Sequence, residues 1–69
     1  MIRTNKPDVE VNNQGSIVLL TPRTDRASQW IRDHVHTEPH NWFGHSLAVE
    51  HRYADAIIKG MRRDDLAVA

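Results

Sequence analysis

Sixty-nine residues make one small domain, and a chain of this length buries only about 60% of the surface that it exposes when unfolded. Nine basic and nine acidic side chains cancel, so no global field favours nucleic acid or another charged partner. The sequence has no cysteine, which excludes disulfides and thiolate metal sites and leaves packing, a histidine-bound metal or a second chain to support the core.

The N-terminal part of the chain predicts a flexible tail followed by a hairpin. Residues 1–8 are polar and contain a proline, as is typical of a frayed terminus, so the domain is expected over residues 9–69. Residues 9–11 alternate like a short edge strand, and residues 12–15 combine asparagine and glycine as turns do. A second strand over residues 16–21 would complete the hairpin across a four-residue loop.

This second strand is apolar on both faces. Side chains alternate along a strand, so Ile17 and Leu19 point one way while Val18 and Leu20 point the other. A strand of this kind requires cover on both sides. The sequence therefore raises the question of what covers the face that the helices leave open.

A first helix is predicted at about residues 24–35. Thr24 is a plausible N-cap, and Asp25 in the first turn suits the helix dipole. The buried face is expected to consist of residues at helical spacing: Ala27, Trp30, Ile31, His34 and Val35.

The segment after this helix predicts a loop and then another strand. Pro39 blocks continuation of the helix, and Gly44 is expected to mark a bulge or a tight bend before a strand over residues 46–49.

A second helix is predicted from about His51 to Arg63. Its core stripe is expected to be Tyr53, Ala56, Ile57 and Met61, broadened by Ala54, Ile58 and Gly60. Leu66 is expected to pack back on the last turn as in a Schellman motif, although Asp65 is a poorer left-handed residue than glycine. The apolar segment 67–69 could add to a sheet edge.

The order (β)βαβα predicts an α+β protein, a small two-layer α/β sandwich with two helices on one face of a two- or three-stranded sheet. A strand–helix–strand connection of this length is usually a right-handed crossover between parallel strands. This topology leaves Val18, Leu20 and Ala48 on the uncovered face; the opposite parity leaves Ile17 and Leu19 there instead. Trp42, if exposed, would anchor an interface, so the predicted interface residues are Val18, Leu20, Ala48 and Trp42.

The histidines are one candidate for chemistry. Three imidazoles can form an open zinc or nickel site, and the candidate ligands are His34, His36 and His40. Their spacing matches no compact metal motif, and a helix C-terminus also suits His34 and His36. We therefore expect no metal or other cofactor, with a histidine-bound metal protein as an alternative.

Basic side chains on the second helix are another candidate, because a basic helix face can bind phosphates. The residues concerned are Arg52, Lys59, Arg62 and Arg63. Acidic residues are interspersed with them and no nucleic-acid-binding motif is visible, so a solvated face is favoured over nucleic-acid binding.

Catalytic residues are not indicated. His45 and Ser46 are adjacent, but neighbours in a strand point to opposite faces, and no nucleophile elbow surrounds them. Glu50 and His51 fall at a strand-to-helix junction, where a capping and surface role is the simpler interpretation. A chain of this size has little room for a deep pocket, so we expect no enzyme.

Several segments in combination resemble small uncharacterised proteins of bacterial genomes, prophages and phages. The resemblance covers about residues 15–66 and rests on Gly15-Ser16-Ile17-Val18-Leu19-Leu20-Thr21-Pro22, Trp30-Ile31, Trp42-Phe43-Gly44 and Leu47-Ala48-Val49-Glu50-His51-Arg52-Tyr53. Those proteins usually end the last helix with Asp-Gly-Leu, where this chain has Asp64-Asp65-Leu66. The resemblance implies no activity.

The sequence as a whole favours a non-enzymatic protein-interaction module that forms a homodimer through an exposed sheet face or edge. An accessory protein of a phage or mobile element, binding a host protein, would fit. No apolar run approaches the about 20 residues of a membrane span, and residues 1–8 lack the apolar segment of a signal peptide, which predicts a cytoplasmic protein.

Overall fold

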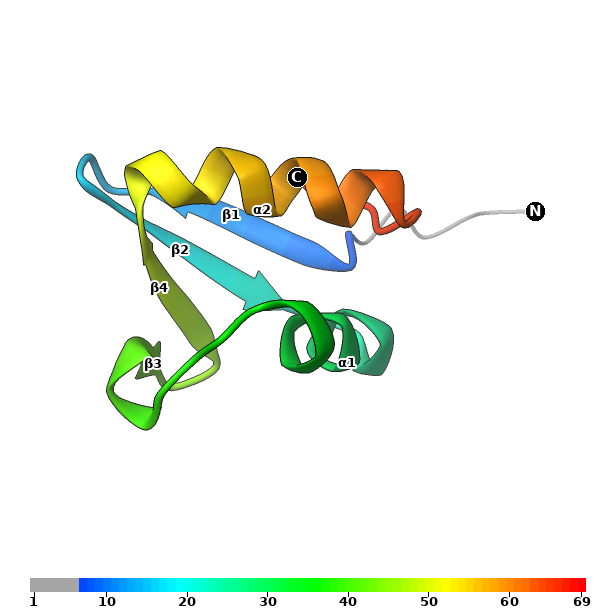
Figure 1. Cartoon of the computed structure of the whole chain (residues 1–69), viewed down its shortest axis with the longest axis horizontal. Helices are drawn as coiled ribbons and strands as arrows, with labels where there is room; N and C mark the ends of the chain where they lie inside the picture. The colour runs from blue at the N-terminus through cyan, green and yellow to red at the C-terminus, as the bar shows by residue number, and fades with distance from the viewer. Residues whose placement is uncertain (1–6) are drawn as a thin grey trace.

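The structure is a computed structural model that describes residues 7–69, apart from the side chain of His40. Seven elements follow one another along the chain (Figure 1): β1 (Val9–Asn13), β2 (Ile17–Pro22), α1 (Asp25–His34), the 3-10 helix η1 (Pro39–Asn41), β3 (Trp42–Phe43), β4 (Ser46–Glu50) and α2 (His51–Arg63).

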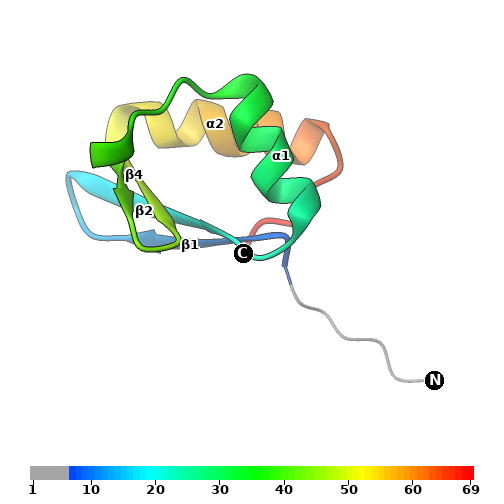
Figure 2. The same ribbon diagram turned by 90° about the horizontal axis from the view of Figure 1, so that it is seen from below.

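The four strands form one sheet in the order β1-β2-β4-β3, and every neighbouring pair is antiparallel. Both helices lie on the same face of this sheet (Figure 2). The predicted two-layer α+β fold is therefore confirmed, with four strands instead of two or three. The chain builds it from two hairpin–helix units, β1-β2-α1 and β3-β4-α2, which meet along β2 and β4.

The parallel crossover expected between β2 and β4 is wrong. The prediction assumed that the chain passes from α1 directly into the strand beside β2. Instead, η1 and β3 come first, and a tight turn at Gly44 (φ 64°) and His45 reverses the chain into β4. This extra hairpin brings β4 alongside β2 in the antiparallel direction. Gly44 marks the tight bend that the sequence predicted, since a positive φ suits glycine.

The first hairpin is present, but β1 is longer than the predicted strand and the loop is shorter. Residues 14–16 connect the strands. Gly15 has φ 90°, and its N–H donates to Oδ1 of Asn13 at 2.9 Å. Asparagine and glycine thus form the turn for the reasons that predicted it: a local side-chain acceptor and an accessible left-handed region.

The sequence favoured Val18 and Leu20 as the side chains of β2 that point away from the helices, but the structure has them pointing toward the helices. Val18 and Leu20 are 3% and 0% exposed, because they point toward the helices with their partners Val49 and Leu47. They cannot be the uncovered pair of an interface, and that prediction is wrong. The core is made of Val9, Val18, Leu20, Ala27, Ile31, Leu47, Ala54, Met61 and Leu66.

Helix α1 has the predicted bounds and the predicted N-cap, Thr24. Oγ1 of Thr24 accepts a hydrogen bond from the Ala27 N–H at 3.1 Å, and the N–H of the C-cap Val35 donates to the Ile31 carbonyl oxygen at 2.9 Å. Ala27 and Ile31 are buried, while Trp30 packs against the edge of the core and is only half-buried.

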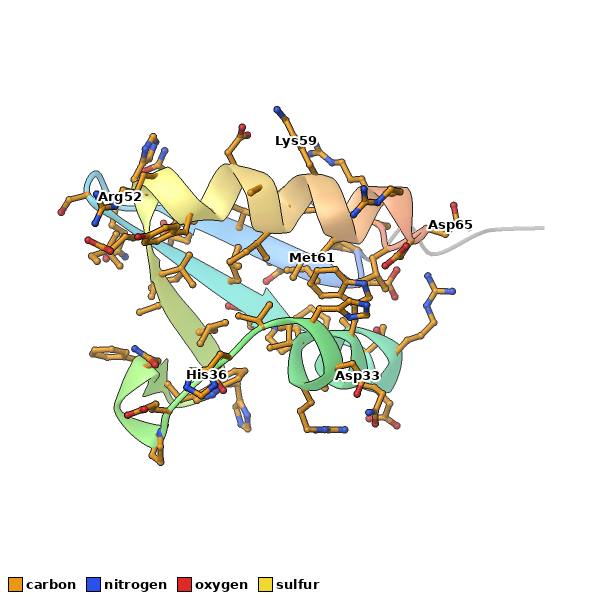
Figure 3. The ribbon with its side chains drawn as sticks, viewed as in Figure 1. Asp33, His36, Arg52, Lys59, Met61 and Asp65 are labelled. Atoms are coloured by element: carbon orange, nitrogen blue, oxygen red, sulfur yellow. The ribbon has the colours of Figure 1, made fainter. Side chains whose placement is uncertain are left out.

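Helix α2 has the predicted bounds, and its buried residues Ala54, Gly60 and Met61 all belong to the predicted broadened stripe, of which Tyr53 and Ala56 are exposed. Tyr53 is 53% exposed, whereas Ala54 and Met61 are buried. Figure 3 shows Met61 pointing toward the sheet and Lys59 pointing away from it. Gly60 is buried because the Trp30 ring packs on it; a Cβ at this position would lie 3.3 Å from Cζ2 of Trp30.

The C-terminus of α2 forms the predicted Schellman motif. The Leu66 N–H donates to the Met61 carbonyl oxygen at 2.9 Å, and the Asp65 N–H donates to the Arg62 carbonyl oxygen at 3.1 Å. Asp65 occupies the left-handed position with φ 69°, and Leu66 is buried. Residues 67–69 then pair in parallel with β1 through Val9 and Val68, which confirms that this segment adds to a sheet edge.

Asp8, which the sequence placed in the predicted tail, belongs to the folded domain; residues 1–6 of that prediction lie outside the described part of the chain. Its carboxylate accepts hydrogen bonds from Oγ1 of Thr24 and from the Ala67 N–H, each at 2.9 Å, and Nη2 of Arg26 lies 3.9 Å away. The hydrogen bonds from Ala67 and then from Thr24 lower the pKa of Asp8 below its usual value; burial opposes them, and the Arg26 charge adds the smallest lowering effect.

Within residues 7–69, neither helix combines the length and the apolar character needed to cross a membrane.

Candidate functional site

The face of the sheet opposite the helices carries a strip of apolar side chains. Leu19 on β2 pairs with Ala48 on β4, and both are half-buried. Ile17 and Phe43, which lie on the same face by the strand alternation, are 37% and 66% exposed. We call these four residues, Ile17, Leu19, Phe43 and Ala48, the helix-free strip.

Polar side chains surround the helix-free strip. Thr21 and Ser46 lie directly opposite each other at one end, and their hydroxyl oxygens are 2.7 Å apart in a hydrogen bond. Glu10 and Asn12 on β1 and Glu50 at the end of β4 are exposed on the same face. An apolar centre with a polar rim is the usual organisation of a protein interface.

The predicted interface residues are thus divided between the two faces. Val18 and Leu20 lie in the core, and Ala48 lies in the helix-free strip. Trp42 is half-buried on the helix side, where its Nε1–H donates to Oγ1 of Thr37 at 3.3 Å. Phe43, the neighbouring aromatic residue, is the exposed one.

Sequence reasoning missed Ile17, Leu19 and Phe43 as members of the exposed strip. The alternative orientation of β2, which the sequence left open, placed Ile17 and Leu19 on the uncovered face. Phe43 could not be placed because the β3–β4 hairpin, which sets the face of each of its residues, was not predicted.

The candidate metal ligands His34 and His36 have separate partners. The imidazole of His34 stacks on the Trp30 ring, with centroids 4.4 Å apart, and its Nε2 lies 3.9 Å from Oδ2 of Asp64. Nε2 of His36 lies 3.8 Å from Oε2 of Glu38. The side chain of His40 lies outside the description. Among the side chains that the structure does describe, no group of three acidic, histidine or cysteine residues could hold a metal ion.

The His34 stack belongs to a contact between the two helices. Nε1–H of Trp30 donates to Oδ2 of Asp64 at 2.7 Å, and Nδ1 of His34 lies 2.9 Å from the Trp30 carbonyl oxygen. These contacts hold the C-terminal end of α1 against the end of α2. The histidine is therefore used in helix packing.

The basic residues of α2 are exposed but interspersed with acids. Nη2 of Arg52 lies 3.5 Å from Oε1 of Glu50, and Nζ of Lys59 lies 3.3 Å from Oδ2 of Asp55. Arg62 and Arg63 are exposed in the last turn. Two of the four basic side chains are thus paired with carboxylates, which weakens the alternative of nucleic-acid binding.

The residues considered for catalysis occupy structural positions. His45 lies in the tight turn between β3 and β4, and the hydroxyl of Ser46 bonds to that of Thr21. Glu50 ends β4 and is the N-cap of α2, so the predicted strand-to-helix junction is confirmed.

No protein-family model, curated protein or solved structure matches this chain. The resemblance to small proteins of bacteria and phages therefore stays a prediction.

Proposed function

We propose that this chain is a small, non-enzymatic protein-interaction module that forms a homodimer through the helix-free strip. The observation that carries the proposal is the exposure of Ile17 and Phe43, at 37% and 66%, on the one sheet face that no helix covers. Apolar side chains grouped on one face and rimmed by polar residues mark interaction surfaces more often than scattered ones do.

A second copy is the occupant that this face fits best. The domain is small and has neither a disulfide nor, among the described residues, a metal cluster to support its core. Two sheets can pack face to face at about 30° and bury both strips at once. Ala48, small and central beside Leu19, allows close approach of the second sheet.

Sedimentation equilibrium tests the homodimer. Replacing Ile17 and Leu19 together by lysine should convert a dimer into a folded monomer, because it would place four ammonium groups within the apolar centre of the contact. Lys59→Glu on the solvent side of α2 is the matched charge control and should stay dimeric. A wild-type chain that sediments as a monomer at high micromolar concentration would contradict the proposal.

An accessory role in a phage or mobile element extends this proposal: the same strip would bind a host protein in place of the second copy. In that case the lysine variant should lose the host partner together with self-association.

A further inference from the structure

The large apolar and aromatic side chains that are exposed within residues 7–69 all line one groove. They are Ile17 at 37%, Phe43 at 66% and Tyr53 at 53% exposed. The groove has a volume of about 550 Å³ and lies between β4, α2 and the segment that follows α1. Ile57 of α2 adds to its apolar wall. The largest exposed apolar groups of the domain therefore surround a single hollow.

The groove is continuous with the helix-free strip. Ile17, Phe43 and Ala48 of the strip are among its lining residues, and so is Glu50, which pairs with Ile17 on the same sheet face. Phe43 pairs with Ser46 at the start of β4, whereas Glu50 ends that strand. A second sheet that packs on the strip would therefore also cover the mouth of the groove.

Two copies of the strip can meet face to face about a two-fold axis in two ways. When the axis runs along the strands, the facing strands are parallel and β4 of each copy lies over β2 of the other. When the axis runs across the strands, the facing strands are antiparallel and each strand lies over its own counterpart, end over end. The positions of the exposed side chains distinguish the two arrangements.

The parallel arrangement brings unfavourable groups together. Phe43 pairs with Ser46, which bonds to Thr21, and Thr21 pairs with Glu10 on the far side of the sheet, so these residues lie at one level. Rotation about the strand direction would lay the exposed Phe43 ring on the partner's Glu10. It would also bring Glu50 beside the partner's Glu50, which places two like charges in the contact.

The antiparallel arrangement places each Phe43 over the groove of the other copy. Reversal of the strands carries Phe43 from the Ser46 end of its own β4 to the Glu50 end of the opposite β4, where β3 no longer flanks the strand. The groove lies there, and Tyr53 lines it. An aromatic side chain that fills a pocket of the other chain is a frequent anchor of interfaces.

The same arrangement pairs charges at the two ends of the strip. Nη1 of Arg23, which follows β2, lies 3.6 Å from Oε1 of Glu10, and this contact keeps Arg23 on the helix-free face. Glu50 lies at the opposite end of the strip. Reversal brings Glu50 near the partner's Arg23, and the two-fold axis makes this contact twice. Such rim pairs select an orientation more than they add affinity.

We propose that two copies pack strip on strip with their strands antiparallel, so that Phe43 of each fills the groove of the other and Glu50 lies beside the partner's Arg23. This inference rests on the proposed homodimer and adds its geometry. A chain that stays monomeric would overturn both, whereas a dimer with other contacts would overturn only the geometry.

Mixed-label NMR tests the geometry directly, because the chain has one phenylalanine and one tyrosine. One deuterated preparation carries a protonated Phe43 ring and the other a protonated Tyr53 ring. After mixing, a nuclear Overhauser effect between the two rings can arise only between chains. We expect this cross-peak in the wild-type dimer; a dimer that lacks it would overturn the proposed geometry.

Charge exchange tests the orientation by affinity. Arg23→Glu and Glu50→Lys should each weaken self-association about tenfold in sedimentation equilibrium, because each replaces two attractive contacts by two repulsive ones. Both side chains are more than half exposed, at 53% and 57%, so both variants should fold. The double variant, which exchanges the two charges, should recover the wild-type affinity.

Lys59→Glu is the matched control, because Lys59 points away from the sheet, and it should leave the affinity unchanged. Single variants that associate as the wild type does, or a double variant that combines both losses, would contradict the antiparallel arrangement.

Discussion

Asp65 carries the largest local backbone cost visible in the described residues. Its φ of 69° places a branched polar side chain where glycine is favoured, and the Schellman hydrogen bonds of the α2 terminus depend on that conformation. The Asp65 carbonyl also accepts a hydrogen bond from Nη2 of Arg26, which ties the turn to α1. The backbone of residue 65, and not its carboxylate, is therefore what the fold uses.

Asp65→Gly should consequently stabilise the chain. Relief of the left-handed strain is worth about 1 kcal/mol in the free energy of unfolding, and the Arg26 contact is retained because it is made to the backbone. Urea denaturation at neutral pH measures the difference. Asp65→Ala, which removes the carboxylate but keeps a Cβ, is the control and should bring no such gain. A destabilised Asp65→Gly would show that the carboxylate itself is needed.

The alternation of β2 decides which residues form the core and which form a candidate interface. Leu20 is fully buried against the helices, whereas Leu19, its neighbour, lies on the helix-free strip. Leu20→Ala should therefore cost about 2–5 kcal/mol in the free energy of unfolding, as for other buried leucines. Leu19→Ala should cost about 1 kcal/mol or less in the monomer, because little of the lost surface was buried.

Denaturation of both variants in the Ile17→Lys background, where the proposed dimer is weakened, keeps self-association out of the comparison. Equal losses for the two variants would mean that both faces of β2 are covered within one chain.

Local signals were enough to predict most elements. Thr24 capped α1 as expected, Gly15 and Asn13 formed the turn, and α2 began and ended at the predicted residues. The parity of β2 was not predictable in this way, because Ile17, Val18, Leu19 and Leu20 are all apolar and the pattern is the same for either face. Only the packing of α1 and α2 distinguishes the two faces.

The short strand β3 escaped prediction for a different reason. Two residues carry no periodicity, and Trp42 and Phe43 owe their strand conformation to pairing with Leu47 and Ser46. Missing this hairpin produced both the parallel crossover and the wrong faces for Trp42 and Phe43. The error of topology and the misplacement of Trp42 and Phe43 thus had one origin, whereas the wrong face of β2 came from its uniformly apolar sequence.

At the scale of the whole molecule, Asp8 joins three distant parts of the chain. Its carboxylate links the start of β1 to the N-cap of α1 and to residue 67 beyond α2. These bonds favour the ionised form, which is why the pKa of Asp8 lies below the ordinary value of 3.8.

The lowered pKa predicts how stability depends on pH. A carboxyl group whose pKa is lower in the folded than in the unfolded state contributes its stabilisation above the unfolded value and loses it as pH falls through the folded value. The wild type should therefore be more stable than Asp8→Asn at pH 7, and the difference should shrink as pH drops below the ordinary value of 3.8. Urea midpoints across this range measure it; a difference that does not change with pH would contradict the role of ionised Asp8.

The meeting of two hairpin–helix units along β2 and β4 has a consequence for how the chain folds. Each hairpin joins residues that are close in sequence, so each unit can form quickly on its own. The β2–β4 pairing, by contrast, brings Ile17 to Glu50 and must close the whole of α1, η1 and β3 into a loop. We therefore expect loop closure between the two halves to limit the rate of folding, and substitutions at side chains on this seam, such as Val18 and Val49, to change that rate.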